Sequence, residues 1–167
     1  LFMWATTSML RPSETVKIRT DWIDGDVLTI PGSEMKKRKP HRVPLSDFMQ
    51  RILWAARSES PHPRSPFIWC GRSAGAPMSS QTITKYLHAS PMSGRLVGHG
   101  LRSIARSWLA DHGAPFEAAE ACLAHVTGSK VSRSYQRSDY LDARRDLMAR
   151  WSEYVEACAN SAGLELP

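Results

Sequence analysis

The apolar residues between positions 101 and 109 recur with the spacing of an α-helix. They stand three and four residues apart, at Leu101, Ile104, Ala105, Trp108 and Leu109. This spacing puts five apolar side chains on one stripe of a helix, and such a stripe has to be buried against other elements. The chain has 167 residues, which is enough for one domain with a core of packed helices.

Helices are also expected before and after this one. Ser46 is a suitable N-cap for a helix with an apolar face. Pro115 suits the start of another helix, in which Phe116, Ala119 and Leu123 are expected to face inward.

A long last helix is expected after Ser138 and Asp139, which are residue types that cap helices. Its expected apolar stripe consists of Leu147, Trp151, Val155 and Cys158.

One small antiparallel sheet is predicted in the first third of the chain. Asp24 and Gly25 form a hairpin-type turn, and residues 27–30 and 41–45 have the composition of strands. The basic run 36–39 then lies in the loop between these two strands. The predicted fold class is therefore mainly α with a small antiparallel β-sheet, an α+β fold.

The charge balance points to a polyanionic partner. The chain has 22 Lys and Arg against 16 Asp and Glu, a net charge of +6. A basic domain of this kind most simply binds nucleic acid. No apolar run approaches the ~20 residues that span a bilayer, so we expect no membrane contact. The 3 cysteines lack a C-x-x-C pattern, which excludes a zinc knuckle and a disulfide framework and favours the cytoplasm.

Several polar residues could carry chemistry, although each has a simpler interpretation. His99, Arg102 and Arg106 share one face at the start of a helix, where a phosphate could bind. Taken alone, such a triplet is more often a solvated polar face. His125 alone would be a helix C-cap, and Tyr135 alone would be a half-buried packing residue.

Taken in order, these residues resemble the catalytic domain of the tyrosine recombinases, the phage integrase family. The similarity is greatest to integrases of prophages and genomic islands, and it covers about residues 8–155. The matching stretches are RPSE at 11–14, a run from Ile30 to Ser46 that contains MKKRKPHRVPLS, HGLRS and WLA within 99–110, LAH at 123–125, and Y-x-R-S-D-Y-L with RR-x-LM and W within 135–151. Five motifs in order are far more specific than any one of them.

The resemblance implies a transesterification on DNA that needs no metal and no other cofactor. Arg11 and Arg102 would clamp the scissile phosphate, because each guanidinium can grip two oxygens. Tyr135 would be the nucleophile and form a 3′-phosphotyrosyl link. His99 would accept the tyrosine proton or hold the phosphate, and His125 would donate a hydrogen bond to a phosphate oxygen.

The leaving 5′-oxygen needs a proton, which the resemblance assigns to a lysine of the basic hairpin. Lys36, seven residues before Val43, is the lysine that fits the family's spacing, and Lys37 is the alternative. The other basic residues expected to contact DNA phosphates are Lys37, Arg38, Lys39 and Arg106.

The resemblance also implies how the chain is organised and what it assembles on. Residues 1–167 would form a single catalytic domain, and the absence of an initiator Met suggests that N-terminal DNA-binding domains precede it. We expect a nucleoid-associated enzyme, monomeric when free and tetrameric on the double-stranded DNA of its attachment sites. Three alternatives stay open: a type IB topoisomerase-like enzyme, a non-catalytic DNA-binding module, and a protein-interaction domain that uses the last helix.

Overall fold

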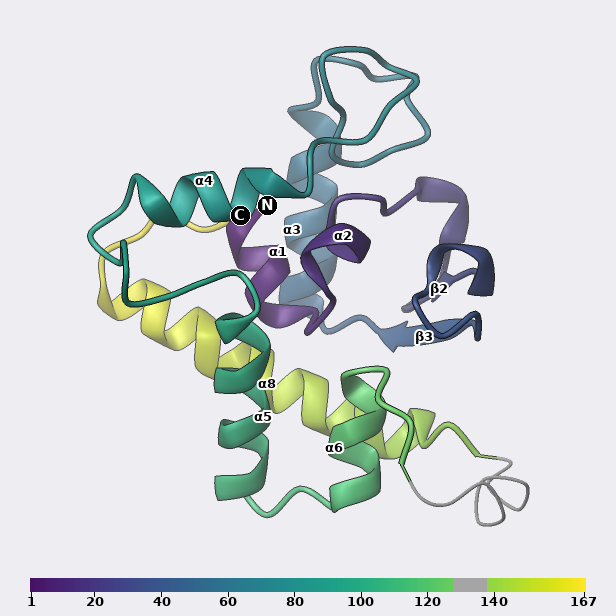
Figure 1. Cartoon of the computed structure of the whole chain (residues 1–167), viewed down its shortest axis with the longest axis vertical. Helices are drawn as coiled ribbons and strands as arrows, with labels where there is room; N and C mark the ends of the chain where they lie inside the picture. The colour runs from purple at the N-terminus through teal and green to yellow at the C-terminus, as the bar shows by residue number, and fades with distance from the viewer. Residues whose placement is uncertain (128–137) are drawn as a thin grey trace.

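The fold is a bundle of helices with a small sheet against one side (Figure 1). A computed structural model describes residues 1–127 and 138–167. Its helices are α1 (Phe2–Thr7), α2 (Pro12–Thr15), α3 (Asp47–Ser58), α4 (Gln81–His88), α5 (Gly100–Asp111), α6 (Phe116–Cys122) and α8 (Leu141–Ser161). The strands are β1 (Ile23–Asp24), β2 (Val27–Ile30) and β3 (His41–Pro44). The predicted fold class, mainly helical with a small antiparallel sheet, is confirmed.

The long helix α8 is the element on which most of the others pack. It contacts α1, α3, α5, α6 and strand β3. Trp151 lies at its centre, fully buried, and the indole Nε1 donates a hydrogen bond of 2.9 Å to the carbonyl of Thr6 in α1. The two ends of the described chain are therefore joined through one buried aromatic side chain.

The sheet has the predicted hairpin topology, with the strands in the order β1-β2-β3. Gly25 occupies the left-handed region with a φ of 55°, as a tight hairpin turn requires. Strands β2 and β3 are antiparallel, with Ile30 opposite His41 and Val27 opposite Pro44. The basic run 36–39 lies in the exposed loop between these strands, as predicted.

The start of α3 follows the prediction, whereas the start of α8 does not. The Ser46 hydroxyl accepts a hydrogen bond of 3.3 Å from the backbone N–H of Met49, which caps α3. The expected cap of the last helix by Ser138 and Asp139 is wrong, because the N-cap residue is Tyr140, in a left-handed conformation. Ser138 Oγ accepts from the N–H of Tyr140 instead, and the carboxylate of Asp139 pairs with an arginine.

The predicted stripes are mostly correct, but three of their members face solvent. Ile104 is 49% exposed, because α5 buries the narrower row that contains Ala105 and Leu109. Phe116 is 57% exposed, because it begins α6 and its ring lies beside the guanidinium of Arg106 rather than in the core.

Cys158, expected on the stripe of the last helix, is also exposed. Its neighbour Ala159 is buried instead, four residues after the buried Val155. The helical repeat of 3.6 residues allows either position, and the contacts of α8 select this one.

No helix in residues 1–127 or 138–167 is long and apolar enough to span a bilayer.

On helix α5, Leu109 is buried and Ile104 is exposed, which gives the first testable prediction. Leu109→Ala should lower the free energy of unfolding by about 2–5 kcal/mol, because it leaves a cavity in the core. Ile104→Ala, on the same helix, should change it by about 0.5 kcal/mol or less. Urea unfolding curves of the two variants measure both effects, and equal losses would contradict the placement of Ile104.

Candidate active site

Arg102 is buried at the start of α5, where it connects two distant segments of the chain. Only 3% of Arg102 is exposed to solvent. Nη1 donates a hydrogen bond to the carbonyl of Met9, and Nη2 donates one of 2.7 Å to the carbonyl of Leu123. Nη2 also lies 3.2 Å from His125 Nε2. Arg102 is therefore not part of a solvated polar face. It holds the segment that precedes Arg11 and the segment that precedes His125 close together.

The main chain turns sharply just before Arg11. Met9 is fully buried and has a φ of 55°, in the left-handed region. Arg11 then caps α2, and its guanidinium forms a 3.0 Å ion pair with the buried carboxylate of Glu14. The second oxygen of Glu14 accepts from the backbone N–H of Arg11, also at 3.0 Å. Glu14 thus holds both the backbone and the side chain of Arg11.

The chain just before α5 approaches the first turn of α2 closely. A Cβ added to Gly98 would lie 3.3 Å from the Pro12 ring, so this approach suits a glycine. His99 follows at the N-cap position of α5 and is exposed. His99 stands three residues before Arg102 in the chain, but within the described residues it is not among those that line the cleft.

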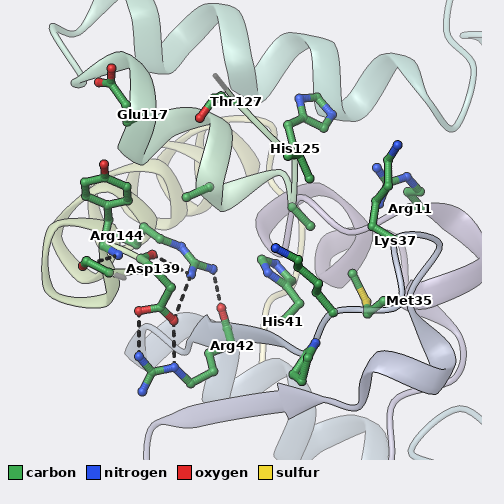
Figure 2. A pocket seen from close by; sticks show the side chains of 17 residues that line it. Arg11, Met35, Lys37, His41, Arg42, Glu117, His125, Thr127, Asp139 and Arg144 are labelled. Carbon is green, nitrogen blue, oxygen red and sulfur yellow. Dashed lines mark hydrogen bonds and ion pairs between the residues drawn. The ribbon is translucent and has the colours of Figure 1, made fainter. Parts of the chain in front are cut away.

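A cleft of about 280 Å³ opens beside these residues (Figure 2). Basic side chains and histidines from several separate segments of the chain line it: Arg11, Lys37, Lys39, His41, Arg42, His125 and Arg144. Lys36 and Arg38 are exposed on the same loop, outside the described lining of the cleft. Of the two candidate proton donors, Lys37 is therefore the one that faces the cleft.

The positive charges of the site affect one another. Burial and, after it, the nearby guanidinium of Arg11 lower the pKa of Arg102 to about 10, against the opposing effects of Glu14 and Glu120. Arg102 thus keeps its proton at neutral pH. Two protonated guanidinium groups this close together suit an anion with several oxygens, such as a phosphodiester.

His41 is a feature of the site that the sequence analysis missed. It begins β3, is 6% exposed, and its ring lies centrally among the side chains of the cleft (Figure 2). Burial and, after it, the positive charges of Arg144, Arg102 and Arg11 lower its pKa to about 3, against an opposing effect of Asp139. Its Nε2 is buried without a hydrogen-bond partner among the described residues. In the sequence, the burial of His41 is indicated only by its position two residues before Val43, on the same face of the predicted strand.

A second missed feature is an arginine–carboxylate cluster on the other side of the cleft (Figure 2). Arg42 binds both oxygens of Asp139, at 2.8 and 2.6 Å. The buried Arg144 donates to the carbonyls of Arg42 and Asp139. The cluster therefore ties the chain just before α8 to strand β3.

Arg106 and Tyr135 are the two remaining site residues that the sequence predicts. Arg106 is half-buried, and its Nε lies 2.5 Å from Glu120, so this guanidinium is engaged inside the protein in the DNA-free structure. A phosphate contact by Arg106 stays a prediction. Tyr135, the predicted nucleophile, lies outside the described residues.

Comparison with known proteins decides the family. A family model described as the phage integrase family matches residues 1–141. The chain belongs to the phage integrase family. The tyrosine recombinase resemblance of its sequence motifs is thereby confirmed.

Several curated integrases are similar to this phage integrase chain. Prophage integrase IntA of Escherichia coli K12 is 41% identical over 172 residues, which cover 99% of this chain and 40% of that protein. Prophage integrase IntS of the same organism is 32% identical over 131 residues, and so is the integrase of Shigella phage Sf6. The chain thus spans about 40% or less of the length of these relatives. No solved structure gives a significant match.

The burial of His41 predicts an acid sensitivity of this phage integrase domain. An unfolded histidine titrates near 6.5 and folded His41 near 3, so the stability it contributes is present above about pH 6.5 and is lost as the pH falls toward 3. Between about pH 7 and pH 5 this loss amounts to about 2 kcal/mol. His41→Gln should remove that part of the pH dependence in urea unfolding measured at both pH values. Equal pH dependence in the two proteins would contradict the neutral burial of His41.

Proposed function

We propose that this chain is the catalytic domain of a site-specific DNA recombinase that cuts and rejoins DNA strands through a 3′-phosphotyrosyl intermediate. The observation that carries the proposal is the position of Arg102. Its guanidinium is held between two backbone carbonyls and lies beside His125, while Arg11 lies close enough to lower its pKa. Basic and imidazole groups from remote segments of the chain thus meet beside one cleft.

Such a cluster suits phosphoryl transfer without a metal. Attack on a phosphodiester adds negative charge to oxygens that already carry one. Arg11 and Arg102 can meet that charge with donors that are already fixed, Arg11 by Glu14 and Arg102 by the two carbonyls.

The proposed reaction consists of a cleavage step and a rejoining step, and each step exchanges one ester bond at phosphorus. The Tyr135 hydroxyl attacks phosphorus, the bond from phosphorus to the 5′-oxygen breaks, and DNA stays attached to Tyr135 through its 3′-phosphate. His99 takes the tyrosine proton, and a lysine of the basic hairpin gives a proton to the 5′-oxygen. Attack of a 5′-hydroxyl on the phosphotyrosine reverses these steps. The bond energy is kept in the intermediate, so no nucleotide cofactor is required.

The same proposal covers the partners and the assembly. The substrate is double-stranded DNA at attachment sites, and the exposed loop between β2 and β3 brings Lys37, Arg38 and Lys39 to its phosphates. Residues 1–167 act as one catalytic domain of a longer chain that works in the cytoplasm, associated with the nucleoid. The domain is a monomer when free, and four copies assemble on two DNA sites.

The first test of this function is covalent capture of DNA by Tyr135. A nicked substrate that carries the attachment site loses its short 5′ fragment after cleavage, so the intermediate accumulates. The wild-type protein should give an SDS-stable adduct, and Tyr135→Phe should give none because phenylalanine has no nucleophile. Gel electrophoresis detects the adduct, and peptide mass spectrometry locates it.

Tyr86→Phe is the matched control, since Tyr86 lies on α4, away from the cleft. An adduct that survives Tyr135→Phe would contradict the proposed nucleophile. Relaxation of supercoiled plasmid without an attachment site would favour the topoisomerase-like alternative. DNA binding without any adduct would favour the non-catalytic module.

A second test identifies the lysine that protonates the leaving oxygen. Sulfur in place of the bridging 5′-oxygen leaves as a thiolate and needs no proton. The alanine variant of the true acid should therefore cleave normal DNA about 10²–10⁴-fold more slowly, yet cleave the sulfur-bridged substrate at nearly the wild-type rate. We expect this rescue for Lys36→Ala.

Lys37→Ala is the comparison, because Lys37 faces the cleft. Rescue of Lys37→Ala alone would move the acid role to Lys37. Rescue of neither variant would remove Lys36 and Lys37 from this step.

A further inference from the structure

Glu120 joins two site arginines and His125 into one chain of contacts. It lies on α6, and its side chain is 15% exposed. One carboxylate oxygen lies 2.5 Å from Arg106 Nε, and the other lies 2.8 Å from His125 Nδ1. His125 Nε2 then lies 3.2 Å from Arg102. Glu120 is not among the residues that the sequence motifs indicate.

These distances fix the protons on His125. An arginine can only donate, so Nε2, beside Arg102, must accept with its lone pair. A neutral imidazole carries one proton, which is therefore on Nδ1. Nδ1–H donates it to the carboxylate of Glu120. In the DNA-free site both ring nitrogens of His125 are thus occupied.

This arrangement conflicts with the role of His125 in the proposed reaction. A phosphodiester oxygen only accepts hydrogen bonds, and His125 in this state has no proton free to donate to it. The conflict ends if the phosphate draws the Arg102 donor away from Nε2 and Nε2 takes up a proton from solvent. His125 then becomes an imidazolium, with Nε2–H toward the phosphate and Nδ1–H toward Glu120.

Glu120 is suited to stabilise that imidazolium. Burial raises the pKa of its carboxyl, but hydrogen bonds from Arg106 and His125 outweigh burial and hold the pKa below its usual value. Glu120 is therefore ionised at neutral pH and lies in contact with Nδ1. An opposite charge at this distance favours the protonated form of a histidine.

We propose that Glu120 is a positioning residue that directs the Nε2 edge of His125 toward the scissile phosphate and holds His125 as an imidazolium when that phosphate is bound. The inference rests on the proposed function, since it assigns His125 to the phosphate. Other charged or titratable groups also face His125 across the cleft or lie around it: Arg11, Lys37, Lys39, His41, Arg42, Arg102, Arg106, Glu117, Asp139, Tyr140 and Arg144.

The test in solution compares Glu120→Gln with wild type in single-turnover cleavage of the nicked substrate, between about pH 5.5 and 8.5. Glutamine keeps the length and one acceptor oxygen but removes the charge. The fall in rate at high pH should begin about one pH unit lower in the variant, which makes it about tenfold slower there. At the acid end the two rates should agree within about threefold. In a His125→Asn background, Glu120→Gln should cause no further pH-dependent loss.

Glu156→Gln is the matched control, because Glu156 forms an ion pair of the same 2.5 Å length with Arg51, away from the cleft. Its pH profile should match that of wild type. A Glu120→Gln profile that is unchanged, or lowered by one factor at every pH, would leave Glu120 with a structural role only and overturn the proposal.

A second measurement does not depend on activity. Nitrogen-15 NMR of the DNA-free wild-type protein should find a protonated Nδ1 and an unprotonated Nε2 on His125, and Glu120→Ala should move the Nδ1–H proton resonance upfield because its hydrogen bond to the carboxylate is lost. An Nε2–H tautomer in wild type would overturn the proposal even if cleavage occurs. Conversely, absence of a Tyr135 adduct in wild type would refute the proposed function and leave this test of Glu120 standing.

Discussion

The buried guanidinium of Arg102 is the interaction on which the site depends. Its donors satisfy the carbonyls of Met9 and Leu123, two chain positions that no strand or helix joins. Burying a charge is costly unless its donors are paired, so the two carbonyls offset much of that cost, while Arg102 Nε has no partner among the described residues. Because Arg11 follows Met9 by two residues and His125 follows Leu123 by two, the same pairing that stabilises Arg102 also sets their positions.

The cleft concentrates positive charge, and the protein offsets it with a few specific groups. Glu14 binds Arg11, Asp139 binds Arg42, and Glu120 binds both Arg106 and His125. His41 contributes in another way, since it fills the space beside the guanidinium groups without adding a charge. A partial balance of this kind leaves the cleft attractive to a phosphodiester while the DNA-free domain stays folded.

Local patterns predicted the elements well, and the exceptions have physical causes. The hairpin at Gly25 and the cap at Ser46 depend on neighbouring residues alone, and both were correct. Asp139 was expected to cap the last helix, but Arg42, 97 residues away in sequence, binds its carboxylate. Ile104 and Cys158 fit a helical stripe, yet the width of each buried face is set by the partner helix.

The sequence by itself determined the family, the predicted nucleophile and the order of the candidate catalytic residues, because these are encoded in residue types at fixed spacings. Only the tertiary structure decided which side chains meet. Glu120 becomes part of the site through Arg106 on another helix and through His125 beyond the end of its own helix, and His41 becomes part of it through burial among arginines of other segments. Hydrogen bonds and desolvation act over a few ångströms of space, so the packing of the helices and the sheet, rather than residue types along the chain, decides which of these groups meet.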